Sequence, residues 1–222
     1  MPEDSVIIEK SGPKLTLSLN RPEVINALSP AVLKSIESAF DEAERDDEIK
    51  VVILRANGTR GFSSGLDRKH SDEHREGYAK VVFYRFFYGL IHRIDTFPKP
   101  VISLVHGHCV GAGAQLAIAA DIIIAADNLQ LLEVELRGSG AFAQEDWPRR
   151  LSRLLGPIKA KYYLLATAPF TGQQALEMGL VSKVVPADEL DIAGNGLADQ
   201  IATYSAIGVP RMLRLVDEES GV

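Results

Sequence analysis

Two glycine-bearing stretches hold the residue types that could most readily do chemistry. The first, GFSSG at 61–65, fits the G-x-S-x-G pattern of a serine nucleophile, with Ser63 in the central position. That pattern needs a strand before the serine and a helix after it. The apolar run 51–56 predicts the strand, but residues 66–77 show no helical apolar period. A serine hydrolase is therefore disfavoured, and the alternative is a turn whose backbone N–H groups hold negative charge.

The second stretch, VGAGA at 110–114, lies at the start of an expected helix. Gly111, Ala112 and Gly113 allow another group to approach the backbone closely. Free N–H groups in the first turn would point at that group with the favourable end of the helix dipole. Close packing of a helix on a strand would use the same small residues, so this stretch alone leaves both interpretations open.

Histidines offer a weaker signal. His70 and His74 are four residues apart with Asp72 between them, a spacing that suits a metal if the segment is helical. No third ligand is evident, so no metal site is predicted. His106 and His108 lie in a buried-strand context and are expected to be structural.

The composition describes an ordinary globular chain of 222 residues, with 46% hydrophobic residues, 24% charged residues and a net charge of -6. Because no block of basic residues occurs, neither nucleic acid nor a membrane surface is expected as a partner. The single Cys109 and an acidic N-terminus unlike a targeting peptide predict a cytoplasmic protein. Residues 101–120 are uncharged and long enough to span a membrane, but their histidines and glycines favour a buried strand, turn and helix.

The elements that must position these stretches alternate along the chain. Ser29 can cap a helix that begins at Pro30, and residues 78–94 predict a long amphipathic helix. Apolar strand patterns occur at 6–10, 14–20, 50–56, 101–105 and 121–126, the first two forming a hairpin. This alternation of strands and helices indicates an α/β architecture.

The second half of the chain continues with a predicted strand, several helices and a last strand. The strand covers 129–136, helical segments cover 147–155 and 159–166, and a capped helix followed by a strand covers 171–185. We expect a core domain at 1–186 and a more polar helical region at 187–222.

Four stretches in order resemble the crotonase superfamily of enoyl-CoA hydratases and isomerases. They are NRPEVINALS (20–29), FSSGLDRKH (62–70), GHCVGAGAQLAIAADIIIAAD (107–127) and TGQQALEMGLVSKVV (171–185). The resemblance implies an α/β fold, a crotonase-like superhelix of repeated ββα units with a short C-terminal helical region. It also implies an acyl-CoA substrate, no cofactor beyond the coenzyme A of that substrate, and a homo-oligomer, either a trimer or a dimer of trimers.

The resemblance further implies how the site works. Two backbone N–H groups hold the thioester oxygen as it becomes an enolate, and by position these belong to Leu66 and Ala112. The flanking Gly65 and Gly111 line the substrate site. The loop Asp67, Arg68 and Lys69 matches the place where the family contacts the CoA nucleotide. Ser63 is then not catalytic.

Hydratases of this family use two glutamates, whose positions here hold Gln115 and Glu135. Gln115 cannot accept a proton. One carboxylate suffices to move a proton from C2 to C4 of a 3-enoyl-CoA, so the resemblance implies an isomerase-like enzyme with Glu135 as the base. A hydratase in which Gln115 holds water, and a non-catalytic acyl-CoA binding protein, stay open. Glu133 could replace Glu135 if the register shifts by two residues.

Two departures from the family pattern affect this interpretation. Residues 136–147 read LRGSGAFAQEDW where the family commonly shows a glycine-rich turn and a Thr-Gln-Arg-Leu stretch. The C-terminal region is also shorter than is usual for the family.

Overall fold

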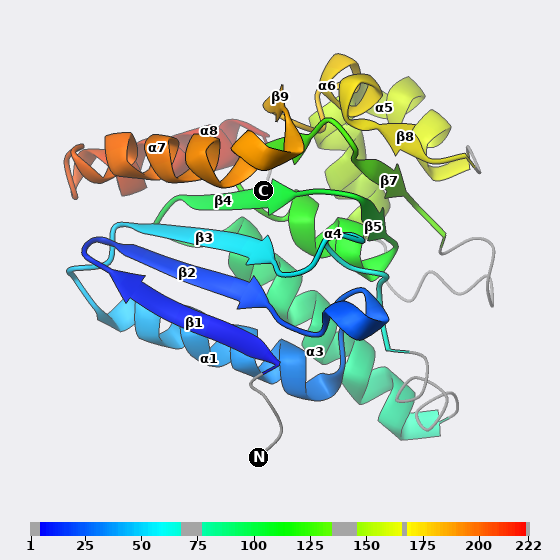
Figure 1. Ribbon diagram of the computed structural model, residues 1–222, viewed down its shortest axis with the longest axis horizontal. Helices are drawn as coiled ribbons and strands as arrows, with labels where there is room; N and C mark the ends of the chain where they lie inside the picture. Colours follow the sequence, from blue (N-terminus) through cyan, green and yellow to red (C-terminus); the bar gives the residue numbers. More distant parts are fainter. Residues whose placement is uncertain (1–4, 68–76, 135–145, 166–167, 221–222) are drawn as a thin grey trace.

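A six-stranded sheet forms the centre of the computed structural model, which describes residues 5–67, 77–134, 146–165 and 168–220 (Figure 1). The strand order is β1-β2-β3-β4-β6-β9. β1 runs antiparallel to β2, and all other neighbouring strands are parallel. The strands are β1 (Val6–Ser11), β2 (Lys14–Leu19), β3 (Val51–Ala56), β4 (Val101–Val105), β6 (Ile122–Ala126) and β9 (Lys183–Val185). The predicted hairpin and the three predicted buried strands are confirmed.

Helices cover both faces of this sheet because its central strands are apolar on both faces. Alternate residues of β3 separate accordingly: Val52 and Leu54 join the core cluster that contains α1, whereas Val51 and Ile53 pack with α7. In Figure 1, α1 (Pro30–Arg45) and α3 (Gly77–Asp95) lie below the sheet and α7 (Leu190–Ala202) lies above it. The predicted α/β layering follows directly from this two-sided burial.

Helix α1 starts where the sequence predicts. The Ser29 hydroxyl accepts a hydrogen bond from the Val32 N–H at 3.3 Å, and Pro30 occupies the first helical position. The helix buries one apolar stripe, formed by Val32, Leu33, Ile36, Ala39, Phe40 and Ala43. Below the sheet, Phe40 meets Phe97 edge to face, with ring centroids 4.8 Å apart.

A smaller sheet and three further helices complete the described fold before β9. This sheet contains β5 (His108–Val110), β7 (Gln130–Leu132) and β8 (Phe170–Thr171). The helices are α4 (Ala112–Ile118), α5 (Asp146–Leu165) and α6 (Gly172–Met178). The two predicted helical segments, 147–155 and 159–166, correspond to the two parts of α5, which are separated by non-helical backbone at Gly156 (φ 73°, ψ 160°); residue 166 lies outside the described part of the chain.

Of the predicted strand 129–136, the described residues 129–134 are strand at Gln130–Leu132 alone. The Glu133 carboxylate accepts the N–H of Val134 at 2.9 Å, so this donor is not available to a strand ladder. Residues 135 and 136 lie outside the described part of the chain. The sequence pattern missed this ending because alternation does not show a side chain that competes with the strand ladder for a backbone donor.

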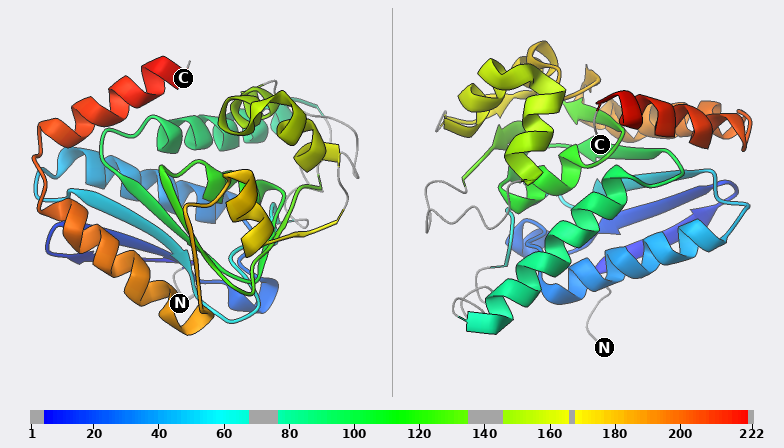
Figure 2. Two further views of the ribbon diagram at one scale, coloured as in Figure 1. Left: turned by 90° about the horizontal axis from the view of Figure 1, so that it is seen from above. Right: turned by 180° about the vertical axis from the view of Figure 1, so that it is seen from behind.

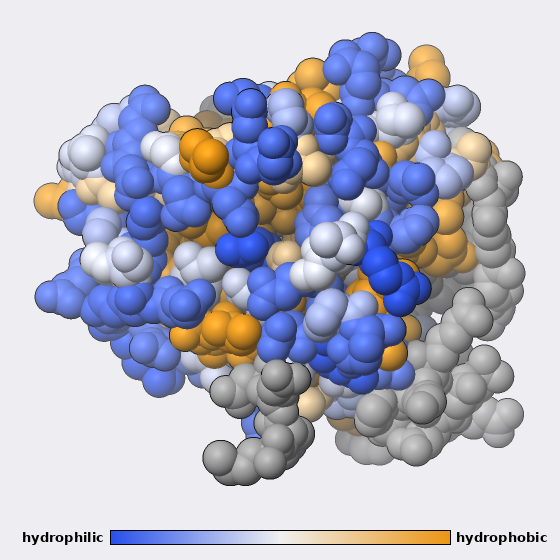
Figure 3. All heavy atoms as spheres, in the orientation of Figure 1, coloured by the Kyte–Doolittle hydropathy of each residue, from blue (hydrophilic) through white to orange (hydrophobic). Residues whose placement is uncertain are grey.

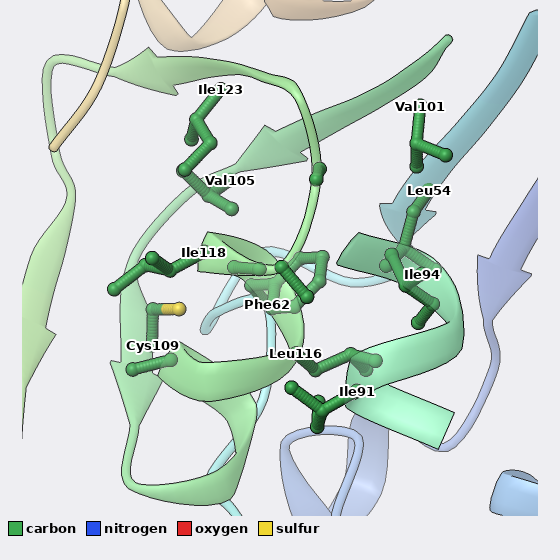
Figure 4. Close-up of a cluster of buried hydrophobic side chains, with 14 of the residues drawn as sticks. Leu54, Phe62, Ile91, Ile94, Val101, Val105, Cys109, Leu116, Ile118 and Ile123 are labelled. Atoms are coloured by element: carbon green, nitrogen blue, oxygen red, sulfur yellow. The ribbon is translucent and has the colours of Figure 1, made fainter. Parts of the chain in front are cut away.

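The uncharged stretch 101–120 folds as β4, β5 and α4, in agreement with the strand, turn and helix prediction. Within the described residues, no helix is long and apolar enough to cross a membrane. Figure 4 shows the core that this stretch helps to build, where Cys109, Leu116 and Ile118 pack near Phe62 and Ile91. Burial raises the pKa of the Cys109 thiol, so this cysteine is an inert core residue.

The C-terminal region is helical, as predicted. It contains a short 3-10 turn, η3 (Ala187–Glu189), followed by α7 and α8 (Gly208–Ser220). Figure 2 shows α7 and α8 as successive helices on the same side of the sheet. The domain boundary between residues 186 and 187 stays a prediction. On the face drawn in Figure 3, hydrophilic residues predominate and the hydrophobic areas are separate.

Candidate functional site

The two glycine-bearing turns meet in space. Gly65 has φ 91° and Gly111 has φ 53°, conformations that L side chains rarely adopt. A Cβ on Gly65 would lie 2.9 Å from the Val110 carbonyl oxygen and 3.6 Å from the Ala112 nitrogen. Glycine is therefore required at 65 both for backbone conformation and for the close approach of the first turn to the start of α4.

Backbone pairing determines the direction of the Leu66 N–H. Leu28 donates to the Gly65 carbonyl at 2.8 Å, and Asp67 donates to the Leu28 carbonyl at 3.0 Å. In such a parallel bridge, the N–H of the central residue points away from the partner strand. The Leu66 N–H consequently points to the other edge of this segment, where Ser63 pairs with β5.

The start of α4 presents the second donor. The Gly111 N–H is bonded to the Leu132 carbonyl at 2.9 Å, and the Gln115 N–H closes the first turn on the Gly111 carbonyl at 3.0 Å. Between them the Ala112 N–H is one of the helix-start donors without an intrahelical acceptor. Across the described residues, neither the Leu66 nor the Ala112 N–H has a hydrogen-bond acceptor.

Ser63 has a structural role in this turn. Its side chain is fully buried and donates to the Asn26 carbonyl at 2.9 Å, while the Gly65 N–H donates to the Ser63 hydroxyl at 3.2 Å. A Cβ on Gly113 would lie 2.6 Å from the Ser63 Cβ, so α4 packs directly on this serine. These contacts agree with the expectation that Ser63 is not a nucleophile.

Gln115 lies one turn into α4 and is only 1% exposed. Its amide nitrogen and oxygen are both buried, and neither has a hydrogen-bond partner within the described residues. A buried primary amide without partners costs free energy of about 1–3 kcal/mol. Such a group is typical of a site whose polar partner arrives with a ligand.

Of the two candidate glutamates, the structure describes Glu133 alone. Glu135 lies outside the described residues, so its predicted role is untested. Glu133 is 4% exposed, and its carboxylate accepts hydrogen bonds from the Trp147 indole N–H and the Val134 N–H, both at 2.9 Å. Tyr163, also buried, lies close enough for the charge of Glu133 to contribute, after burial, to raising the pKa of its phenol. Glu133 is thus held within the protein core.

Of the predicted CoA-binding loop, only Asp67 is described. It is 9% exposed and accepts a hydrogen bond from the Arg21 guanidinium at 2.8 Å, and the same guanidinium nitrogen donates to the Ala27 carbonyl at 2.7 Å. This ion pair ties the loop to the stretch at 20–29. Arg68 and Lys69 lie outside the described residues, and the CoA contacts stay predictions.

Two of the four candidate histidines, His106 and His108, lie in the described part of the chain. His70 and His74 lie outside the described residues. The His106 ring donates its Nε2–H to the Gly58 carbonyl at 2.8 Å, and burial lowers the pKa of His106. His108 is exposed, contrary to the buried context expected of it, because the short β5 turns this side chain outward. In the described part of the chain, no three His, Cys, Asp or Glu residues are placed to hold a metal.

Sequence reasoning missed the partners of the candidate residues. Trp147 and Tyr163 lie near Glu133, and Arg21 pairs with Asp67, through tertiary contacts between segments far apart in sequence. Arg21 lies within the motif 20–29 and beside a buried aspartate in space, but nothing in the sequence alone pairs the two residues. A tryptophan that follows an acidic strand end at a distance of 14 residues carries no recognisable spacing signal either.

The sequence is similar to proteins of known family. Residues 13–214 match a protein family described as enoyl-CoA hydratase/isomerase. A short-chain-enoyl-CoA hydratase of Clostridium acetobutylicum is 32% identical over 208 residues, which cover 93% of this chain and 78% of that protein.

Solved structures agree with this match. An enoyl-CoA hydratase/carnithine racemase from Magnetospirillum magneticum superposes with a TM-score of 0.91 at 26% identity, covering 97% of this chain and 81% of that one. A probable enoyl-CoA hydratase from Mycobacterium thermoresistibile gives 0.85 at 30% identity, covering 98% and 88%. The predicted crotonase-like α/β fold is confirmed.

Proposed function

Because the chain belongs to the enoyl-CoA hydratase/isomerase family, whose members are acyl-CoA enzymes of the crotonase superfamily, we propose that it stabilises a thioester enolate between the N–H groups of Leu66 and Ala112. The observation that carries the proposal is the contact between the two turns. The Gly65 backbone approaches the Ala112 nitrogen, and neither donor has an acceptor within the described residues.

These donors suit a charge that develops during the reaction. Both are backbone groups whose neighbours are hydrogen-bonded, so they need little reorganisation when the thioester oxygen gains negative charge. Deletion of single donors from comparable oxyanion sites costs about 3–4 kcal/mol of transition-state stabilisation. Gly65 and Gly111 allow the substrate to approach this backbone, and Asp67, Arg68 and Lys69 are proposed to lie along the CoA moiety.

The finer proposal is isomerisation of a 3-enoyl-CoA to a 2-enoyl-CoA. Glu135 removes a proton from C2, the electron pair moves into the thioester to form the enolate, and the same proton returns at C4 as the double bond shifts to C2–C3. An apolar acyl site would raise the pKa of Glu135 towards the range that suits a general base. The neutral Gln115 side chain supports this choice, because hydration draws on a second acid or base that an amide cannot supply.

A hydratase is the alternative, favoured by the names of the relatives described above. In it, Gln115 would hold the attacking water while Glu135 serves as both base and acid. An acyl-CoA binding protein without turnover is the third reading. A homo-oligomer and a cytoplasmic location remain proposals.

The test is incubation of the protein with a panel of 2- and 3-enoyl-CoA esters, with products separated by mass and by double-bond position. We expect 3-enoyl-CoA to give 2-enoyl-CoA faster than 2-enoyl-CoA gives the 3-hydroxy product. The matched variants Glu135→Gln and Glu133→Gln change one oxygen each, two residues apart. Glu135→Gln should abolish turnover while CoA-ester binding survives, because only proton transfer is lost.

Glu133→Gln is the control and should keep most of the turnover at equal folded fraction. Loss of turnover in this variant alone would assign the base to Glu133. Binding of CoA esters by the wild type without any product would support the non-catalytic reading instead.

A further inference from the structure

A cavity lies at the opposite ends of the central strands from the glycine-bearing turns. It has a volume of about 480 Å³ and is bounded by α5, α7, α8 and the amino ends of β4 and β6. A cavity of this size falls within the range that holds a small organic ligand. Because the two turns follow the carboxyl ends of β3 and β4, this cavity is separate from the proposed enolate site.

Apolar side chains form most of the cavity wall. Those contributed by the helices are Leu154 from α5, Leu197 and Ile201 from α7, and Val209, Met212, Leu213 and Val216 from α8. Several of them are unusually accessible, with Leu154 48%, Met212 55% and Val216 58% exposed. Removing such apolar surface from water is favourable. The wall therefore favours a ligand with an apolar body.

Five charged residues also line the cavity: Asp95, Asp121, Arg150, Arg153 and Asp217. The Arg150 guanidinium is already used, since it forms an ion pair with Asp95 and donates to the Ile118 carbonyl at 2.8 Å. Arg153 is exposed on α5. The carboxylates outnumber the guanidinium groups, so the cavity carries a net negative charge once all three carboxyl groups are ionised.

The other two carboxylates of the cavity, Asp121 and Asp217, do not take part in the Arg150–Asp95 ion pair. Asp121 accepts the Val101 N–H at 2.7 Å, but within the described residues neither aspartate has an ion-pair partner. Burial against the cavity wall raises the pKa of Asp121 to about 7, and the nearby charge of Asp217 adds to the rise. Burial also raises the pKa of Asp217, against the opposing effect of Arg150. Asp121 nevertheless stays accessible to solvent within the cavity.

We propose that this cavity binds a hydrophobic organic cation, with its ammonium group at Asp121 and Asp217 and its apolar body along α7 and α8. A cation relieves the repulsion between the two carboxylates, whereas an anionic ligand would add to it. A metal ion fits poorly, because the wall is apolar and the described residues contain no set of three metal-binding side chains. The remaining charged groups that face the site, Asp95, Arg150 and Arg153, sum to a single positive charge, so the site is negative when Asp121 and Asp217 are both ionised.

The test uses n-hexylammonium as the probe, with 1-hexanol and hexanoate as neutral and anionic counterparts, in titration calorimetry of the full chain. We expect one equivalent of hexylammonium to bind more tightly than hexanol, and hexanoate not to bind. Because the ionised fraction of a carboxyl with a pKa of about 7 rises from about a tenth to about nine tenths between pH 6 and pH 8, affinity should rise about tenfold over that interval.

Variants assign the binding to this cavity. Asp121→Asn keeps the acceptor for Val101 and should remove most of the pH dependence, whereas Glu189→Gln, an exposed residue outside the cavity, should behave like the wild type. Met212→Trp and, independently, Leu154→Trp fill the cavity and should abolish binding. Three results would each overturn the proposal. The first is equal affinity for hexanol and hexylammonium, and the second is a pH dependence of hexylammonium affinity in Asp121→Asn equal to that of the wild type. The third is displacement of hexylammonium by an acyl-CoA.

Discussion

At the scale of single residues, the identity of residue 115 decides how well the proposed site could hydrate a 2-enoyl-CoA. Hydration of a 2-enoyl-CoA requires a water to be deprotonated as it attacks C3 and a proton to be delivered to C2. In the proposed site, where Gln115 takes the place of a second glutamate, one carboxylate, Glu135, would have to serve both events. The Gln115 amide is buried and has no hydrogen-bond partner within the described residues. It could therefore bond to a water or to a substrate oxygen, but it cannot act as an acid or a base.

We therefore predict that Gln115→Glu raises hydratase activity by about 10²-fold, the lower end of what a positioned acid or base supplies. Two nearby carboxylates would repel, raising the pKa of one and separating the acid from the base. The measurement is formation of 3-hydroxyacyl-CoA by both proteins at equal folded fraction. Stability should fall, because the new charge is buried.

Gln115→Met is the matched control, with a similar volume and no proton to exchange. It should leave hydration at the wild-type level or below. If both variants raise hydration equally, or if Gln115→Glu gives no gain, residue 115 does not act on the water in the way proposed.

At the scale of elements, the packing of α4 on the turn at 61–67 controls the separation of the two proposed donors. A Cβ on Gly113 would lie 2.6 Å from the Ser63 Cβ and 2.8 Å from its hydroxyl oxygen. Because Ser63 is itself bonded to Asn26, it cannot move aside without breaking that contact. We predict that Gly113→Ala forces α4 away from the turn, with a loss in kcat/KM of at least about tenfold, the equivalent of 1.4 kcal/mol.

Gly89→Ala in α3 provides the control, since a Cβ there meets no atom within 4 Å. Alanine favours the helix over glycine by about 1 kcal/mol, so this variant should keep its activity and gain thermal stability. The two variants are compared by steady-state kinetics and thermal melting. Normal kcat/KM in Gly113→Ala would show that α4 can shift without disturbing the chemistry.

How far the sequence predicts these elements depends on whether the signal is local. Buried strands such as β3 and the Ser29 cap of α1 follow from apolar runs and a capping residue, and both are found in place. Among the described residues β7 ends at Leu132, and the adjacent Glu133 bonds to Val134 and Trp147, an arrangement that sequence periodicity does not reveal. The G-x-S-x-G letters around Ser63 likewise become a packing site only once α4 is placed against them.

At the scale of the whole molecule, the sheet separates two regions with different roles. Its carboxyl ends lead to the turns that hold the proposed enolate site, and its amino ends face the cavity beside α8. Asp121 stands at the amino end of β6, where it joins β6 to β4 through the Val101 N–H. Because its apolar surroundings raise the pKa of Asp121, the ionisation of this carboxyl is coupled to the free energy of unfolding.

The sign of that coupling follows from the direction of the shift. The pKa of Asp121 is raised in the folded protein to about 7, from 3.8, so between these values the folded state holds a proton that the unfolded state has released. The Asp121 contribution to the free energy of unfolding therefore decreases as pH rises from about 4 to about 7, and it is constant outside that interval. Solvent access to Asp121 within the cavity reduces the size of the effect without changing its sign.

We predict that Asp121→Asn, which keeps an oxygen acceptor for Val101, flattens this part of the pH profile and raises the melting temperature relative to wild type at pH 8. At pH 4, where Asp121 is largely protonated in the folded state, the two proteins should differ much less. Asp127→Asn, an exposed residue at the other end of β6, should reproduce the wild-type profile. Thermal melts of the three proteins across pH 4 to 8 provide the measurement. A wild-type pH slope in Asp121→Asn would mean that Asp121 is ionised at lower pH than its apolar surroundings dictate, and that water in the cavity solvates it fully.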